Sequence, residues 1–407
     1  MNDGSSEQLN KIYPVNGVRL ASHAAGIKVQ GRADMVLIEI AEGSSVAGVF
    51  TRNVFCAAPV TVARQHLASV TPRYFLINAG NANAGTGEQG MRDALESCEL
   101  VASLMDCKKS QVLPFSTGVI GQVMPMTAIH SGIKVLSQNL RDDAWLDAAN
   151  AIMTTDTVSK VVSKQLEIDG VLITVTGIAK GSGMICPNMA TMLAYIFTDA
   201  SVEASVLQHC LGQVSDASFN RITVDGDTST NDACMLVATG VAGITRIDTT
   251  ESRAYRDFNE AIEAVSTALA QMIVRDGEGA TKFITVSVVE GKDEEECAQV
   301  AYTVAHSPLV KTAFFASDPN WGRILAAIGR AGLQTFEIER VSIYLDDICI
   351  VNKGEPAVDY QEAHGQRVMD QDEITVKIVL GRGHAQQTVW TCDFSYDYVK
   401  INAEYRT

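Results

Sequence analysis

Apolar residues recur along the chain in two spacings, which predict strands and helices in alternation. Short runs rich in Val, Ile, Leu and Phe predict β-strands. They lie at 33–40, 45–50, 75–78, 171–178, 192–197 and 282–289. Segments in which apolar residues recur at every third or fourth position predict amphipathic helices. They lie at 91–106, 127–136, 142–153, 202–214, 253–275 and 294–305.

Two groups of strands indicate how sheets form. The runs 33–40 and 45–50 are separated by Glu42 and Gly43, so we expect them to pair through a tight turn. Alternating apolar residues also predict an antiparallel sheet near the C-terminus. Its strands lie at 341–352, 373–380 and 388–394. The predicted fold class is α+β, with layered sheets flanked by helices and a smaller subdomain at the C-terminal end.

Composition and charge exclude several classes of protein. The chain has 407 residues, of which 46% are apolar and 20% charged, a balance typical of globular proteins. Its net charge of −16 argues against binding to nucleic acid or to an anionic membrane. No apolar run approaches the roughly 18–20 residues that span a bilayer, and the polar start does not resemble a signal peptide. We therefore expect a cytoplasmic location.

The cysteines and histidines indicate no metal site. None of the nine cysteines forms a Cys-x-x-Cys pair, and the seven histidines are scattered. This pattern is typical of reduced thiols in a cytosolic protein. Since zinc sites need clustered ligands, we expect no bound metal.

The stretch 180–199 carries the strongest candidate chemistry. A glycine-rich turn at Lys180 to Gly183 follows one apolar run, and Thr191 opens the next, after Pro187. Glycine and proline constrain the loop, so the Thr191 hydroxyl has a fixed direction, as a nucleophile requires. The alternative is a strand connection in which Thr191 only favours the extended backbone.

Three further positions combine polar side chains with unusual contexts. Ser116-Thr117-Gly118 follows a strand-like run, and glycine lets a backbone N–H approach a ligand, which suits either an oxyanion hole or a plain turn. The segment 153–157 surrounds one acid with threonines and is typical of a polar loop. Glu278 follows the helix at 253–275, at an end where cations are preferred, and this position hints at a ligand role.

The stretch from Lys180 to Leu193 resembles the self-cleavage site of the bacterial ornithine acetyltransferase family, the bifunctional glutamate N-acetyltransferases and amino-acid acetyltransferases. The family signature is Lys-Gly-(small)-Gly-Met-Ile followed by Pro-Asn-Met-Ala-Thr-Met-Leu, and the match in this chain is nearly complete and long enough to be very specific. The resemblance extends from about Gly17 to Thr407. It implies an αββα-like sandwich of mixed sheets with an N-terminal threonine nucleophile. Cys186 occupies a slot that varies in the family, and its role stays open.

The resemblance also implies a processed enzyme and assigns its residues. Cleavage between Ala190 and Thr191 would give an alpha chain, 1–190, and a beta chain, 191–407, assembled as a heterotetramer of two of each. Thr191 would be the nucleophile. The oxyanion hole would be formed by the Thr117 side chain and the Gly118 amide. Substrate-binding positions would be Thr154, Lys180, Thr191, Glu278, Asn402 and Thr407.

The implied reaction needs no cofactor. The α-amine of a free Thr191 has a reference pKa of about 8, so near neutral pH a fraction of it can accept the hydroxyl proton. Acetyl would pass from N-acetylornithine to Thr191 and then to glutamate, in arginine biosynthesis; use of acetyl-CoA as a second donor stays open. The alternatives are a related Thr- or Ser-nucleophile amidohydrolase or aminopeptidase, and a ligand-binding protein without catalysis.

Overall fold

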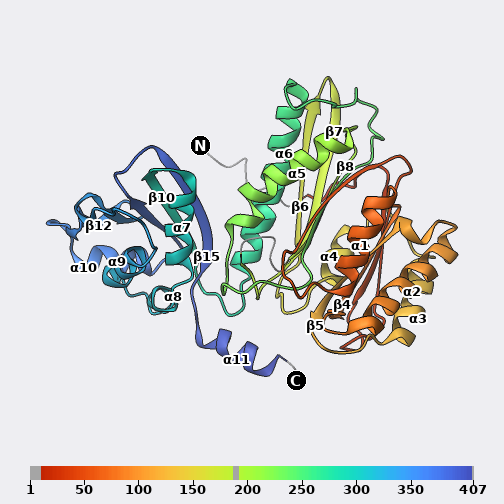
Figure 1. Ribbon diagram of the computed structural model, residues 1–407, viewed down its shortest axis with the longest axis horizontal. Helices are drawn as coiled ribbons and strands as arrows, with labels where there is room; N and C mark the ends of the chain where they lie inside the picture. Colours follow the sequence, from red (N-terminus) through yellow and green to blue (C-terminus); the bar gives the residue numbers. More distant parts are fainter. Residues whose placement is uncertain (1–10, 187–191, 406–407) are drawn as a thin grey trace. The chain divides into compact units, whose positions relative to one another are not determined.

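The computed structural model describes residues 11–186 and 192–405, and the chain forms two compact units. The first unit comprises the chain up to Asn220 together with Asp227–Ile273. The second comprises Arg221–Gly226 and the chain from Val274 onward. The division falls inside one long helix, α6, Arg253–Arg275. Figure 1 labels many of the elements of both units.

The first unit contains two mixed sheets. One has four strands in the order β1, Val18–His23, β2, Met35–Ile40, β4, Tyr74–Asn81, and β5, Val112–Val119. The other has five strands in the order β3, Ser45–Phe50, β9, Ala233–Ala238, β8, Leu193–Thr198, β7, Val171–Lys180, and β6, Lys160–Ile168. Only β4 with β5 and β8 with β9 pair in parallel; the other neighbours are antiparallel.

The two sheets pack face to face around an aromatic core. Phe75 and Phe115 of the first sheet lie with ring centroids 6.1 and 5.2 Å from that of Tyr195 in the second. Trp145 packs edge-on against Phe197 at 5.5 Å and is fully buried. Burial of such large side chains on the inner faces holds the two layers together, because each removes a large apolar area from water.

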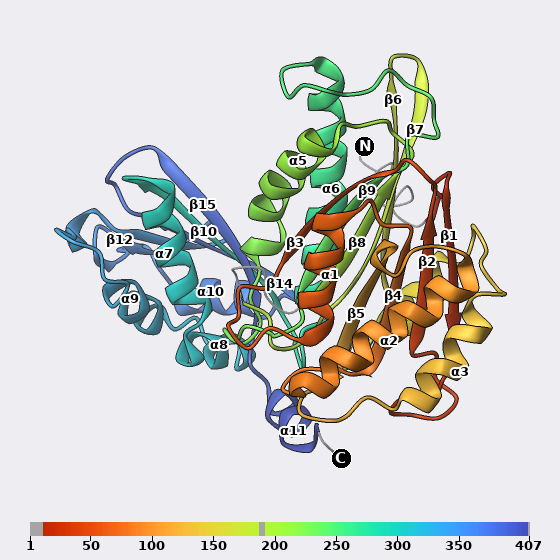
Figure 2. The same ribbon diagram turned by 45° about the vertical axis from the view of Figure 1, so that its right-hand side comes forward.

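Helices cover the outer faces of both sheets (Figure 2). Apolar residues of α2 and α3 form one buried cluster with the outer face of the first sheet. On the second sheet, α6 approaches so closely that a Cβ on Gly177 would touch Leu269 and Val265. The layers therefore run helix, sheet, sheet, helix, and the predicted αββα-like α+β class is confirmed. The helices of this unit are α1, Ala58–Ser69, α2, Gly87–Met105, α3, Met126–Leu136, α4, Trp145–Ala151, α5, Ala204–Ala217, and α6.

The predicted pairing of the first two apolar runs is wrong, although both runs are strands. β2 pairs with β1 and β4, whereas β3 pairs with β9 in the other sheet. The turn between them passes through Gly43, whose φ of +83° is favourable only for glycine. It carries the chain from one layer to the next. A short turn is compatible with a hairpin and also with a crossing between stacked sheets, so its sequence did not identify the partner strand.

The second unit is a six-stranded sheet with a helical layer on it. The strand order is β13, Glu355–Pro356, β12, Ile348–Asn352, β11, Ser342–Leu345, β14, Glu373–Val379, β10, Phe283–Gly291, and β15, Ala385–Cys392. Apolar residues of four helices share one buried cluster with these strands. The helices are α7, Glu294–Ala305, α8, Pro308–Phe315, α9, Trp321–Gly329, and α10, Glu362–Met369, and the chain continues into α11, Tyr396–Glu404.

The C-terminal strands differ from the prediction in two ways. The run 341–352, predicted as one strand, forms the hairpin of β11 and β12, and the sheet is not purely antiparallel. β10 lies between β14 and β15, pairing in parallel with β14 and antiparallel with β15. A parallel neighbour requires a long crossover, which α7 to α10 and the hairpin strands provide. Among the described residues, no helix combines the length and the apolar character needed to cross a membrane.

Candidate active site

The predicted oxyanion residues lie where β4 and β5 run side by side. Gly80 and Gly118 face each other in the parallel register, with φ angles of +100° and +133°. A Cβ on Gly118 would overlap the Gly80 peptide, so only glycine fits there. The backbone of this strand end is therefore fixed by close packing of one strand against the other, which a plain turn would not require.

Lys180, the last residue of β7, reaches the predicted oxyanion threonine. Its Nζ donates to the Thr154 hydroxyl at 2.8 Å and to the Thr117 hydroxyl at 3.3 Å. Both Thr117 and Lys180 are buried. Three residues predicted separately, from segments far apart in the chain, thus meet around one ammonium group.

Asp156 is a member of this cluster that the sequence did not single out. Its carboxylate accepts hydrogen bonds from Lys160 Nζ at 2.7 Å, from the Gly181 amide at 2.7 Å and from the Thr154 amide at 3.0 Å. Lys180 Nζ lies 3.9 Å from it. Burial alone would raise the pKa of Asp156, but the positive charges of Lys180 and Lys160 outweigh burial and hold that pKa well below its usual range. Asp156 is therefore ionised.

A buried amide network supports β5 immediately before Thr117. Asn231 Nδ2 donates to the carbonyl of Ala82 at 2.6 Å and to the carbonyl of Ser116 at 2.8 Å. The Ser116 hydroxyl donates to Asn78 Oδ1 at 2.6 Å. These polar groups can be buried because hydrogen bonds to one another replace those to water. The same hydrogen bonds fix the backbone that precedes the predicted oxyanion donors.

The second unit brings together two further predicted residues. Asn402, on α11, donates through Nδ2 to Glu278 Oε2 at 2.8 Å. The turn that carries Glu278 is held by Asp393, which accepts the amides of Thr281 and Lys282 at 2.8 and 2.9 Å. In the sequence, Glu278 was marked by its unfavourable position after α6 and by the family resemblance.

Three of the predicted positions cannot be placed. Thr191 and Ala190, at the predicted cleavage site, and Thr407, at the C-terminus, lie outside the described residues. Cys186 is the last described residue before the predicted cleavage site and is partly exposed. In the described part of the chain, no group of three His, Cys, Asp or Glu side chains is arranged to hold a metal ion.

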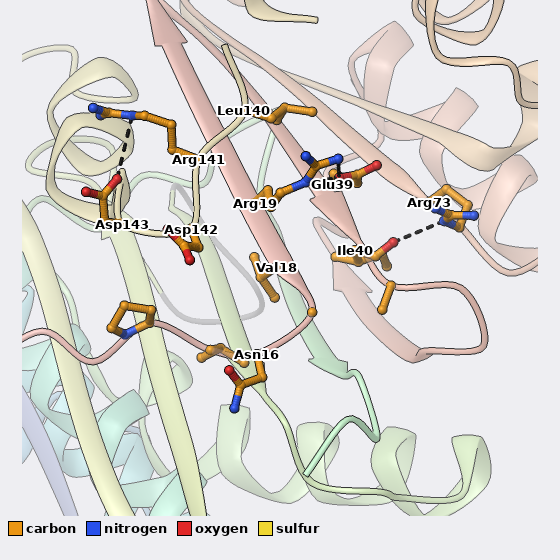
Figure 3. A pocket seen from close by; sticks show the side chains of 14 residues that line it. Asn16, Val18, Arg19, Glu39, Ile40, Arg73, Leu140, Arg141, Asp142 and Asp143 are labelled. Carbon is orange, nitrogen blue, oxygen red and sulfur yellow. Dashed lines mark hydrogen bonds and ion pairs between the residues drawn. The ribbon is translucent and has the colours of Figure 1, made fainter. Parts of the chain in front are cut away.

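A polar hollow of about 710 Å³ lies elsewhere in the first unit, beside the start of β1 (Figure 3). Its lining residues include none of those predicted from the sequence. Its arginines face acids or carbonyl groups of the same hollow. Arg19 lies 2.5 Å from Glu39, Arg141 lies 3.6 Å from Asp143, and Arg73 donates to a backbone carbonyl at 3.0 Å. This hollow therefore does not mark the predicted residues.

Known proteins match this sequence over nearly its whole length. The family model described as "ArgJ family" matches residues 19–407. The arginine biosynthesis bifunctional protein ArgJ of Psychrobacter arcticus is 54% identical over 396 residues, covering 97% of each chain. The protein of that name from Pseudomonas fluorescens is 53% identical over 399 residues, covering 98% of each.

A solved structure supports the same relationship. The crystal structure of the arginine biosynthesis bifunctional protein ArgJ from Bacillus halodurans is 38% identical, with a TM-score of 0.50, and the match covers 52% of this chain and 99% of that one. The family model and the two relatives extend across almost all of the sequence. The chain therefore belongs to the ArgJ family.

Proposed function

We propose that this protein transfers the acetyl group of N-acetylornithine to glutamate through an acetyl ester on Thr191, in arginine biosynthesis. The observation that carries the proposal is the Lys180 ammonium, which binds the hydroxyls of Thr117 and Thr154 at the strand end that leads into the Thr191 loop. The relatives named as bifunctional arginine biosynthesis proteins, 53–54% identical over nearly the full length, support the same assignment.

The first half-reaction forms the acetyl ester. The Thr191 hydroxyl attacks the acetyl carbonyl while the Thr191 α-amine takes its proton. The C–N bond of the tetrahedral intermediate then breaks, the same proton passes to the leaving nitrogen, and ornithine departs. The amine of glutamate attacks the ester in the second half-reaction and returns the hydroxyl to Thr191. One amide replaces another, so no cofactor or energy source is needed.

The contact between Lys180 and Thr117 suits an oxyanion donor. Lys180 Nζ donates to the Thr117 oxygen, so the hydroxyl hydrogen of Thr117 is directed elsewhere and can be donated to a developing negative charge. With the Gly118 amide as a second donor, the tetrahedral oxygen would be stabilised by about 3–4 kcal/mol per donor. The nearby Lys180 ammonium would add to the stabilisation of this negative oxygen, because charges interact more strongly in a buried cluster than in water.

Opposite charges on the predicted binding residues match an amino-acid substrate. Lys180 would bind a substrate carboxylate, and Glu278 would bind an ammonium group. Asn402 holds the Glu278 carboxylate through one oxygen. Thr154 and Thr407 would complete the contacts with the substrate.

Maturation and assembly follow from the same proposal. Self-cleavage between Ala190 and Thr191 would yield chains 1–190 and 191–407, two of each in the active enzyme, in the cytoplasm. The Bacillus halodurans chain, 99% of which matches only 52% of this one, agrees with a product of about half length. A second reaction, acetylation of glutamate by acetyl-CoA, would use the same Thr191.

Intact-mass measurement tests the proposal. Incubation with N-acetylornithine should add one acetyl mass to the fragment that begins at Thr191, and glutamate should remove it. An ester that disappears in water at the same rate without glutamate would indicate an amidohydrolase instead. Absence of any acetylated fragment would contradict the proposal.

Substitution of the nucleophile provides the matched control. Thr191→Ala should yield one polypeptide of 407 residues without transferase activity, because both the hydroxyl and the new α-amine are lost. If this variant still separates into two chains, Thr191 is not the residue that cleaves the backbone.

A further inference from the structure

The segment Thr154-Thr155-Asp156 binds the start of the loop that leads to the predicted cleavage site. Thr154 accepts a hydrogen bond from Lys180 at 2.8 Å. The Thr155 hydroxyl lies 2.6 Å from that of Ser182, and Asp156 accepts the Gly181 amide at 2.7 Å. Three consecutive residues thus contact three consecutive residues. This arrangement holds the beginning of the loop in one place as a unit.

The loop starts buried and bends sharply directly after this contact, at Met184, which is exposed. Ser182 is 1% exposed. Met184 has a φ of +56°, a left-handed conformation that costs a non-glycine residue about 1 kcal/mol or more. A backbone held in this conformation must be stabilised by its surroundings. The contacts at 180–182 hold the chain two to four residues before it.

Asp156 connects this loop to the substrate residues. One carboxylate oxygen binds both Lys160 Nζ and the Gly181 amide. The other binds the Thr154 amide and lies 3.9 Å from Lys180 Nζ. The Lys160 and Asp156 side chains are both fully buried, so Lys160 balances the carboxylate where water does not. A single charged group therefore sets the positions of the loop and of the Lys180 ammonium together.

We propose that Asp156 is a positioning residue for two steps, self-cleavage at Thr191 and binding of the acetyl donor. It acts on the first by fixing Gly181, nine residues before Ala190, and on the second by orienting Lys180 and Thr154. This inference rests on the proposed function, because it takes Thr191 as the cleavage point and Lys180 as a substrate ligand.

Two variants separate this role from folding. Asp156→Asn keeps the shape of the side chain and removes its charge, but it leaves Lys160 buried beside a neutral group. The double variant Asp156→Asn with Lys160→Met removes both charges, a change that is often neutral for stability. Asp199→Asn is the matched control: Asp199 is also buried and accepts the Thr174 amide at 2.8 Å on the neighbouring strand.

The readouts are the half-time of self-cleavage, followed by intact mass, and the KM and kcat of the cleaved fraction. We expect both Asp156 variants to cleave about tenfold to a hundredfold more slowly, the range that a misplacement of about 1 Å produces. In their cleaved fraction KM for N-acetylornithine should rise more than kcat falls. Asp199→Asn should match the wild type in both.

The outcomes distinguish this inference from the proposed function. If the wild type cleaves and carries acetyl while the double variant does both at wild-type rates, Asp156 has no positioning role and the proposed function stands. If the double variant is slow in cleavage with an unchanged urea midpoint, the inference is supported. A wild type that neither cleaves nor becomes acetylated contradicts the proposed function and this inference together.

Discussion

Gly118 has little freedom to change. Its φ is +133°, and an added Cβ would overlap the Gly80 peptide on the neighbouring strand. Gly118→Ala must therefore move the backbone amide that is predicted to bind the oxyanion. We expect kcat to fall about 10²- to 10³-fold, as for loss of one oxyanion donor. Steady-state kinetics with N-acetylornithine and glutamate would measure it.

Gly121 provides the control for this substitution. It lies three residues later with a φ of +79°, and no atom lies within 4 Å of an added Cβ. Gly121→Ala should cost about 1–2 kcal/mol of stability, because alanine disfavours the left-handed region, and should leave kcat unchanged. Equal losses of kcat in the two variants would show that conformational strain, rather than the position of the Gly118 amide, is responsible.

At the scale of single residues, the sequence predicted candidate site residues but not the buried carboxylate that balances their positive charge. Thr117, Thr154 and Lys180 were predicted from the resemblance to the family, and in the structure their side chains lie together. Asp156 was missed because one acid in a polar loop does not reveal its partner. Lys160, four residues later, begins a strand, and only the folded chain shows that its side chain turns back to the carboxylate.

At the scale of elements, the end of α7 carries an unusual group of charges. His306 follows the last residue of this helix, where the dipole would favour a protonated ring. Burial and the positive charges of Lys311 and Arg330 oppose it and lower the pKa of His306 from 6.5 to about 4. The ring nitrogen Nε2 lies 3.0 Å from the hydroxyl of Thr223. The folded chain therefore favours the neutral form of the His306 ring.

This lowered pKa predicts how stability depends on pH. Between pH 4 and 6.5 the unfolded chain binds a proton at His306 that the folded chain does not, so the free energy of unfolding should rise with pH across this window. The full effect is about 3.5 kcal/mol, since the pKa falls by about 2.5 units and one unit corresponds to about 1.4 kcal/mol. Below pH 4 the ring is protonated in both states, and above 6.5 in neither, so the contribution is constant outside the window.

Urea unfolding of the wild type and of His306→Gln would measure this contribution. Glutamine can keep a hydrogen bond to Thr223 and does not titrate. The difference in unfolding free energy between the two proteins should change between pH 4 and 6.5 and stay level from pH 7 to 8. A difference that is constant over the whole range would mean that His306 titrates alike in the folded and unfolded chain.

Element existence was easier to predict than element pairing. α7 begins and ends where the apolar spacing placed it, and α9 is capped by Asn320, whose side chain accepts the Arg323 amide. These features depend on neighbours in sequence. The partner of β3, by contrast, is β9, nearly 190 residues away. Alternating apolar residues show that a strand has a buried face but not which strand it joins.

At the scale of the whole chain, the predicted cleavage point does not coincide with the division into compact units. The units divide near Ile273, whereas Thr191 lies in the connection between β7 and β8 of one sheet. β8 and β9 would belong to the chain 191–407, and β3, β6 and β7 to the chain 1–190. The β8–β9 pair is therefore flanked on one side by β7 and on the other by β3.

This interleaving predicts that the two cleavage products stay together. Six residue pairs join β7 to β8 and six more join β3 to β9, and both products contribute to the core between the sheets. Native size-exclusion chromatography of the cleaved protein should give one peak that contains both chains, and denaturant should separate them. Expressed without its partner, 191–407 would expose β8 and β9 as two unprotected edges and should aggregate, since such edges pair with other chains. Co-expression of 1–190 should restore solubility. Independent elution of the two chains in native buffer would contradict this prediction, because neither product could then be completing the sheet of the other.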